Sequence, residues 1–144
     1  MMRENRGQVS LEYILIFSIS LILLIAFTLP MAEKSVESTL DVSDAIEVKS
    51  NLAEISRAIM QVYGEGQGSR HTIHVTSQKS IRVNVDEDSL SSDLRLKDGT
   101  YKRIKINHAS KLKESFIQLS RGENTVVVEW PTGSESMVIY TKLF

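Results

Sequence analysis

A long run without charged residues dominates the N-terminal part of this 144-residue chain. From Tyr13 to Ala32 there is no Asp, Glu, Lys or Arg, and most side chains are aliphatic or aromatic. An α-helix rises 1.5 Å per residue, so about 20 such residues span the roughly 30 Å hydrocarbon core of a bilayer. The run therefore predicts one membrane-spanning helix and leaves room for one modest domain after it.

Positive charge precedes the apolar run. Arg3, Arg6 and the initial amine favour a cytoplasmic start, which places the rest of the chain on the far side of the membrane. An ordinary secretory signal has a shorter apolar core and an A-x-A-like cleavage site directly after it. Here the residues 29–32 are Leu-Pro-Met-Ala, so a soluble secreted protein cut near Ala32 is not favoured.

A short polar motif lies at the entrance to the apolar run. Gln8, Ser10 and Glu12 alternate after Gly7, and Tyr13 follows at once. A plain anchor needs no carboxylate there, and a charge at the centre of a spanning helix costs roughly 2.5–3.5 kcal/mol, less near the interface. Glu12 therefore predicts a partner or a function.

These residues resemble the class III signal peptide of archaeal type IV-like pilins, whose pattern is Gln-x-Ser-x-Glu followed by an aromatic residue and an aliphatic run. Gln8, Ser10 and Glu12 match it one by one, and Ile16 stands where a longer form of the motif has leucine. The resemblance implies that a membrane-embedded prepilin peptidase cuts between Gly7 and Gln8 and leaves the apolar helix on the mature chain.

The resemblance also implies a structural subunit. The expected protein is a membrane-bound precursor that joins other pilin subunits, through the pilus assembly machinery, in an archaeal cell-surface filament that commonly serves adhesion. It implies no enzymatic activity, catalytic residue or cofactor, and the choice between major and minor pilin stays open. The alternative is a single-pass, membrane-anchored binding module that never polymerises, does not need Glu12 and retains residues 1–7.

Cleavage before Gln8 has a physical logic of its own. It deletes the cationic anchor and creates a new amine in front of an apolar helix, which can then leave the bilayer for a bundle of identical helices. One hypothesis is that Glu12 pairs with this amine on an adjacent subunit and sets the axial register. In the other, the carboxylate serves peptidase recognition. Tyr13 is either an interface anchor or a packing residue in the filament.

The helical pattern resumes after Pro30, which predicts a kink within one continuous helix from about Gln8 to Tyr63. An apolar stripe with spacings of three and four residues follows, and three further apolar residues are expected to widen it. The stripe is Ala45, Val48, Leu52, Ile55, Ile59 and Val62, and the widening residues are Ile46, Ala53 and Met60. Three glycines within residues 64–68 predict a left-handed helix cap and then a flexible joint.

The remainder of the chain alternates with period two, which predicts about six strands in an antiparallel meander. Residues 131–134 suit a hairpin turn, and residues 86–100 predict a loop or an irregular edge. The fold class is α+β, a long helical spine packed on an antiparallel β-sheet head, similar to type IV pilins. The positions that follow this period are Ile73 and Val75; Ile81, Val83 and Val85; Ile104 and Ile106; Ile117 and Leu119; Val126, Val128 and Trp130; Met137, Ile139 and Thr141.

Five segments follow from these patterns. They are a leader removed on processing (1–7), an apolar filament-core helix (8–32), its amphipathic continuation (33–63), a Gly-rich linker (64–70) and a β head (71–144).

Charge is unevenly distributed although the net charge is only −1, which gives no nucleic-acid footprint. Residues 95–113 are basic, whereas the helix after residue 32 is mainly acidic. One hypothesis is that the basic head of one subunit docks on the acidic neck of its neighbour. The alternative is two ordinary solvated faces. The acidic residues of the neck are Glu33, Glu37, Asp41, Asp44, Glu47 and Glu54.

No other pattern predicts chemistry. The chain has no cysteine, and it lacks nucleophile-elbow, phosphate-loop and paired-carboxylate motifs. His71 and His74 fall on opposite faces of one predicted strand, and His108 has no partner nearby in sequence, so no metal site is expected. Residues 86–88, with Asp93, lack the glycine and the final glutamate of a calcium loop and predict a solvated acidic turn. Trp130 is expected in the core or in a turn.

Overall fold

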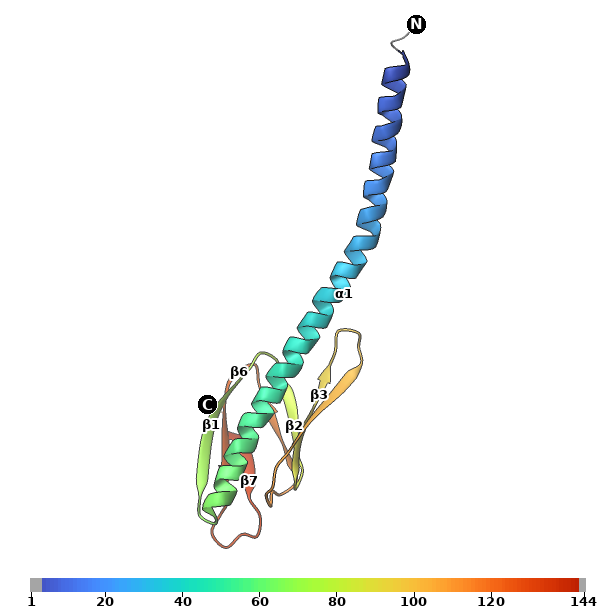
Figure 1. Ribbon diagram of the computed structural model, residues 1–144. Coiled ribbons are helices and arrows are strands. Elements are labelled where there is room, and N and C mark those ends of the chain that lie inside the picture. Colours follow the sequence, from blue (N-terminus) through green and yellow to red (C-terminus); the bar gives the residue numbers. More distant parts are fainter. Residues whose placement is uncertain (1–3, 143–144) are drawn as a thin grey trace. The chain divides into compact units, whose positions relative to one another are not determined.

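The computed structural model describes residues 4–142, and Arg3 of the expected leader lies outside them. One helix, α1 (Glu4–Glu65), precedes seven strands. The chain divides into two compact units, Met1–Leu40 and Asp41–Phe144, and α1 contributes to both (Figure 1). The strands are β1 (Arg70–Ser77), β2 (Ile81–Val85), β3 (Ser89–Arg95), β4 (Tyr101–Asn107), β5 (Ser115–Leu119), β6 (Gly122–Glu129) and β7 (Val138–Lys142).

The prediction of one continuous helix is confirmed. Helix α1 has 62 residues and includes Pro30 in its interior. Proline removes one backbone donor and crowds the preceding turn, so a helix tolerates it only where the residues on both sides maintain the ladder of hydrogen bonds. Good helix formers on either side, among them Leu29 and Met31, fulfil that condition.

The apolar stripe of the second unit forms the helical side of a core. Five of its members, Val48, Leu52, Ile55, Ile59 and Val62, are at most 4% exposed and pack against both sheets. Figure 1 shows this half of α1 lying along the sheets, with β1 and β2 on either side of it. Burial of such a side chain stabilises the fold by about 1.5–3 kcal/mol. The packing of these five side chains therefore contributes strongly to the stability of the head.

Two residues expected to widen the buried stripe do not do so. Ile46 is 64% exposed and Met60 is 46% exposed. The sheets cover only the face of the helix centred on Leu52 and Ile55, and side chains at the margin of the stripe remain in solvent.

The expectation of a single meander is wrong. The strands form two antiparallel sheets, one ordered β1-β6-β7 and the other β4-β3-β2-β5. Strand β1 pairs with β6, in the register Ile73 opposite Val126, and not with its sequence neighbour β2. Residues Ser77 to Ser80 allow the chain to leave the first sheet, since the Ser77 hydroxyl donates to the Lys79 carbonyl at 2.7 Å in a tight turn.

Residues 86–100 also differ from expectation, because they contain strand β3 at an interior position of the four-stranded sheet. The hydrophobic period does not indicate this strand, because three of its buried residues are serines: Ser89, Ser91 and Ser92. The Ser92 hydroxyl donates to the Arg82 carbonyl at 2.9 Å, and that of Ser89 donates to an Asp86 carboxylate oxygen at 3.2 Å. A hydrogen-bonded serine is tolerated in a core where an unpaired one is costly.

The glycine-rich segment caps the helix as predicted, but it is bonded on both sides. Gly66 has φ of 86° and follows the last helical residue. The Ser69 hydroxyl lies 3.0 Å from the Val62 carbonyl and 2.6 Å from that of Gly66. The Gly68 N–H donates to the Trp130 carbonyl at 2.7 Å. These bonds hold the segment against the end of β6, where the sequence predicted a flexible joint.

Candidate processing and assembly site

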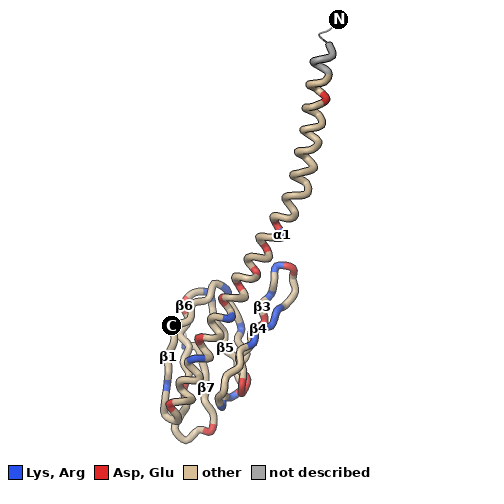
Figure 2. Tube along the Cα trace, in the orientation of Figure 1, with Lys and Arg blue, Asp and Glu red and all other residues tan. Residues whose placement is uncertain are grey.

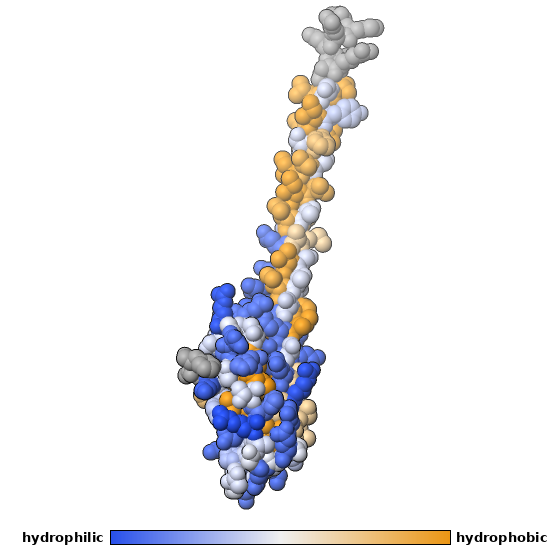
Figure 3. Space-filling model, turned by 90° about the vertical axis from the view of Figure 1, so that its left-hand side faces the viewer, coloured by the Kyte–Doolittle hydropathy of each residue, from blue (hydrophilic) through white to orange (hydrophobic). Residues whose placement is uncertain are grey.

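The unit Met1–Leu40 exposes its apolar side chains. Every residue from 9 to 40 is exposed, including Leu11 at 68%, Phe17 at 68% and Phe27 at 72%. Figure 3 shows orange, hydrophobic side chains along the helix, and Figure 2 shows a long tan stretch of it. In the sequence, no charged residue occurs between Glu12 and Glu33. The helix is long and apolar enough to cross a membrane. Such a surface needs a lipid or protein covering, because each large apolar side chain left in water forgoes about 1.5–3 kcal/mol.

Two hydroxyl groups inside the apolar run are satisfied by the helix itself. Ser18 Oγ donates to the Ile14 carbonyl at 2.7 Å, and Thr28 Oγ1 donates to the Leu24 carbonyl at 2.6 Å. These bonds to the preceding turn reduce the cost of placing the two hydroxyl groups in an apolar environment. The helix surface is therefore compatible with either lipid or a bundle of similar helices.

The signal-motif residues lie at the start of α1. Gly7 and Gln8 are helical, but only their backbone is described. Ser10, Glu12 and Tyr13 have exposed side chains, with Tyr13 at 70%. A helix advances 100° per residue, so Glu12 lies on the side of Gln8, and Ser10 lies nearly opposite.

Glu12 is a carboxylate with an apolar surrounding. A shallow hollow of about 330 Å³ beside it is lined by Leu11, Leu15 and Ile16. Among residues 4–142 no hydrogen bond or ion pair to Glu12 occurs. Burying an unpaired carboxylate is costly, so lipid insertion and helix bundling would each favour a partner for Glu12 from outside the described residues.

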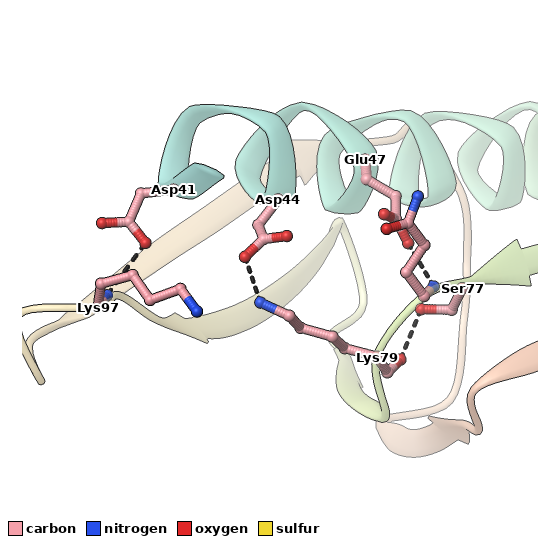
Figure 4. A network of polar contacts seen from close by, with 7 residues as sticks. Asp41, Asp44, Glu47, Ser77, Lys79 and Lys97 are labelled. Atoms are coloured by element: carbon pink, nitrogen blue, oxygen red, sulfur yellow. Dashed lines mark hydrogen bonds and ion pairs between the residues drawn. The ribbon is translucent and has the colours of Figure 1, made fainter. Parts of the chain in front are cut away.

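Three acidic residues of the helix contact their own head, a feature that the sequence did not indicate (Figure 4). Asp44 forms an ion pair with Lys79. Glu47 Oε1 accepts the Gln78 N–H at 2.6 Å, and Asp41 Oδ1 accepts the Lys97 N–H at 3.0 Å. These carboxylates hold the loops that follow β1 and β3, so they belong to the internal structure of the head.

The basic segment is also partly neutralised within the head. Arg103 on β4 faces Asp93 on β3 and donates two hydrogen bonds to its carboxylate, at 2.8 and 3.0 Å. These hydrogen bonds lower the pKa of Asp93 and raise that of Arg103. The pair is a bidentate cross-strand contact. The charge of Arg103 is therefore engaged within its own head and is less available for docking on another subunit.

Trp130 connects the end of the helix to the last hairpin. Its ring stacks on Tyr63 with centroids 5.7 Å apart, and its Nε1–H donates to the Ser134 carbonyl at 2.8 Å. The expected turn is present, since the Ser134 N–H bonds the Pro131 carbonyl at 3.1 Å and Gly133 has φ of 82°. Trp130 therefore has a packing role, as expected for a core or turn residue.

The histidines are dispersed. His71 and His74 both lie on β1, on opposite faces, and the His74 side chain is 61% exposed beside Glu123. His108 is only 4% exposed. Within residues 4–142 no group of three or more His, Cys, Asp or Glu side chains is placed to hold a metal ion.

The buried ring of His108 predicts that the stability of the head depends on pH. Its Nδ1 lies 2.7 Å from the Ser110 hydroxyl, whereas Nε2 is buried and has no hydrogen-bond partner in the described part of the chain. Burial lowers the pKa of His108 below its ordinary value of 6.5. The unfolded chain therefore binds a proton at a higher pH than the folded chain does, so the free energy of unfolding falls as pH falls through 6.5 towards the folded pKa.

We expect His108→Gln to remove this loss between about pH 7 and pH 5, the range in which histidine ordinarily titrates. The measurement is urea unfolding of the detergent-solubilised chain, followed by Trp130 fluorescence at each pH. His74→Gln is the matched control because its ring is in solvent. A pH profile of His108→Gln that coincides with that of the parent would show that His108 does not cause the dependence.

Residues 5–31 match a family model described as class III signal peptide. Searches of curated proteins and of solved structures each found no significant match. The matched range covers the motif Gln8, Ser10 and Glu12 and most of the apolar run. The chain thus carries a class III signal peptide, which is consistent with a type IV-like pilin, on a helix packed against two antiparallel sheets.

Proposed function

We propose that this chain, with its class III signal peptide and pilin-like fold, is a prepilin that a prepilin peptidase cuts between Gly7 and Gln8. The mature chain then polymerises through its apolar helix into an archaeal type IV-like surface pilus, with the β head outside. Adhesion to a surface or to another cell is the role we assign to the pilus. The supporting observation is that the signal match coincides with a helix whose apolar side chains, from residue 9 to residue 40, are exposed among the described residues.

Polymerisation gives a role to Glu12, which a permanent membrane anchor does not need. An anchor requires the apolar run, but it does not require a carboxylate at its entrance. Cleavage would generate a cationic amine at Gln8, one helical turn before Glu12. In a bundle of parallel helices, the amine of one subunit can neutralise Glu12 of another and fix their axial offset. Tyr13 then packs in the filament, and Pro30 remains within the helix.

The test is the N-terminal residue and intact mass of the protein from native cells, with sheared surface fibres and membranes analysed separately. We expect fibre protein that begins at Gln8 with a free amine. A Gln8 cyclised to pyroglutamate would still show cleavage at this bond, but it would contradict the pairing of the amine with Glu12. Gly7→Val, which adds a branched side chain at the cleaved bond, should leave the longer form in membranes. Its matched control is Ser20→Val, within the apolar run and away from the bond.

Protein that retains residues 1–7 and occurs only in membranes would overturn the proposal. It would favour the alternative, a single-pass surface binding module. Cleaved protein that is confined to membranes would support processing and contradict assembly.

A further inference from the structure

The head contains an apolar groove between α1 and β4. Its volume is about 370 Å³, and its apolar walls include Val42, Ala45, Ile46 and Ile104. Val42 is 58% exposed and Ile46 is 64% exposed. Ile46, one of the two exposed residues at the margin of the helix stripe, therefore lines this groove.

Lysines border the groove without counter-ions. Lys49 follows the helical residues of the groove, and Lys102 lies on β4. Within residues 4–142 neither lysine forms an ion pair. The nearby acids are already engaged, since Asp44 pairs with Lys79 and Asp93 with Arg103. The groove therefore presents an apolar floor and a positive rim.

A segment with the complementary properties occurs in the same chain. Glu33, Val36, Glu37 and Leu40 have the spacing i, i+3, i+4, i+7, which places them on one helix face. Val36 is 59% exposed and Leu40 is 47% exposed. In the described residues neither glutamate forms an ion pair. The face combines two apolar side chains with two free negative charges.

We propose that the groove of one subunit receives residues 33–40 of a second copy of this chain. Val36 and Leu40 would cover Val42 and Ile46, and Glu37 would approach Lys102. This inference rests on the proposed pilin function and identifies one lateral contact of the filament. The two surfaces are different, so the contact is head to tail, and a head-to-tail contact that does not close into a ring continues as an open filament.

A charge exchange tests this contact in intact fibres. We expect Lys102→Glu and Glu37→Lys each to lower the yield of sheared fibres at least about tenfold, a factor that corresponds to about 1.4 kcal/mol. The double variant Glu37→Lys/Lys102→Glu restores the opposite charges and should return the yield to within about twofold of the parent. Processed subunit in membranes is measured in every strain, so that loss of assembly is separated from loss of protein.

Matched controls use charges outside the two surfaces. Lys113→Glu reverses an exposed charge of the basic segment away from the groove, and we expect a near-parental yield. Glu54→Lys combined with Lys102→Glu has the same net charge as the exchanged pair but should not restore assembly.

Single variants that assemble like Lys113→Glu would overturn the contact. So would an exchanged pair that is no better than Lys102→Glu, or a Glu54→Lys combination that rescues equally well. The failure of the pilin function itself is distinguishable, because parental cells would then yield no fibres that begin at Gln8.

Discussion

Replacing Glu12 with glutamine is expected to leave cleavage at Gly7–Gln8 intact and to reduce the yield of sheared fibres at least about hundredfold. The glutamine keeps the size and the hydrogen-bonding capacity of the side chain but removes its charge, so the new amine at Gln8 would be buried without a counter-ion. Removal of one partner from a buried ion pair costs about 3–5 kcal/mol, and each 1.4 kcal/mol is a factor of ten. The readouts are fibre yield and the intact mass of the membrane-bound chain.

Glu12→Asp is the matched control, because it keeps the charge and shortens the side chain by one methylene. We expect it to assemble better than Glu12→Gln. Normal cleavage and normal fibres in Glu12→Gln would contradict the register role. Accumulation of uncleaved Glu12→Gln would instead assign the carboxylate to recognition by the peptidase.

The second large effect concerns the core of the head. Leu52 is fully buried on α1, and Leu52→Ala should lower the free energy of unfolding by about 2–5 kcal/mol, the range for deletion of a buried leucine side chain. Urea unfolding in detergent can follow the chain's single tryptophan, Trp130, which stacks on Tyr63 of the same helix.

Met60→Ala is the control for this substitution. Met60 lies on the same helix and is 46% exposed, so its truncation removes fewer contacts and should cost well under half as much. Equal losses for Leu52→Ala and Met60→Ala would show that the helix is not packed on the sheets in the way described.

The sequence predicted the elements that depend on local periodicity. The stripe from Val48 to Val62 indicated the buried face of α1, and six alternating segments indicated strands that the structure contains. A glycine within residues 64–68 was expected to end the helix in a left-handed conformation, and Gly66 does so. These signals are local: a helix face and a strand face each recur within a few residues.

Features that depend on contacts distant in sequence were not predicted. Strand β3 was missed because serines occupy buried positions, and their burial depends on acceptors such as the Arg82 carbonyl. The pairing of β1 with β6 crosses four intervening strands, and no short-range pattern encodes it. The contacts of Asp41, Asp44 and Glu47 with the head loops were missed for the same reason, since charge alone does not identify a partner.

The same distinction between local and distant contacts applies to the candidate site. The signal motif could be read from the sequence because its residues are adjacent and their spacing is fixed. The groove beside Lys102 could not, because it arises only when α1 and β4 come together. Three of the six acids of the neck contact their own head, so the hypothesis of docking through the acidic neck keeps Glu33, Glu37 and Glu54. Of these, Glu33 and Glu37 precede the head unit, which begins at Asp41.

The first residue of α1 in the buried core of the head is Val48. Among the described residues, those before Asp41 supply none of its buried side chains. Two selective pressures can therefore act on one helix with little interference. Substitutions on the exposed strands need not disturb residues 5–31, which match the signal-peptide model, and residues 5–31 can stay constant while the strands diversify. We expect comparison across strains to show slow change before residue 41 and rapid change on the exposed strands.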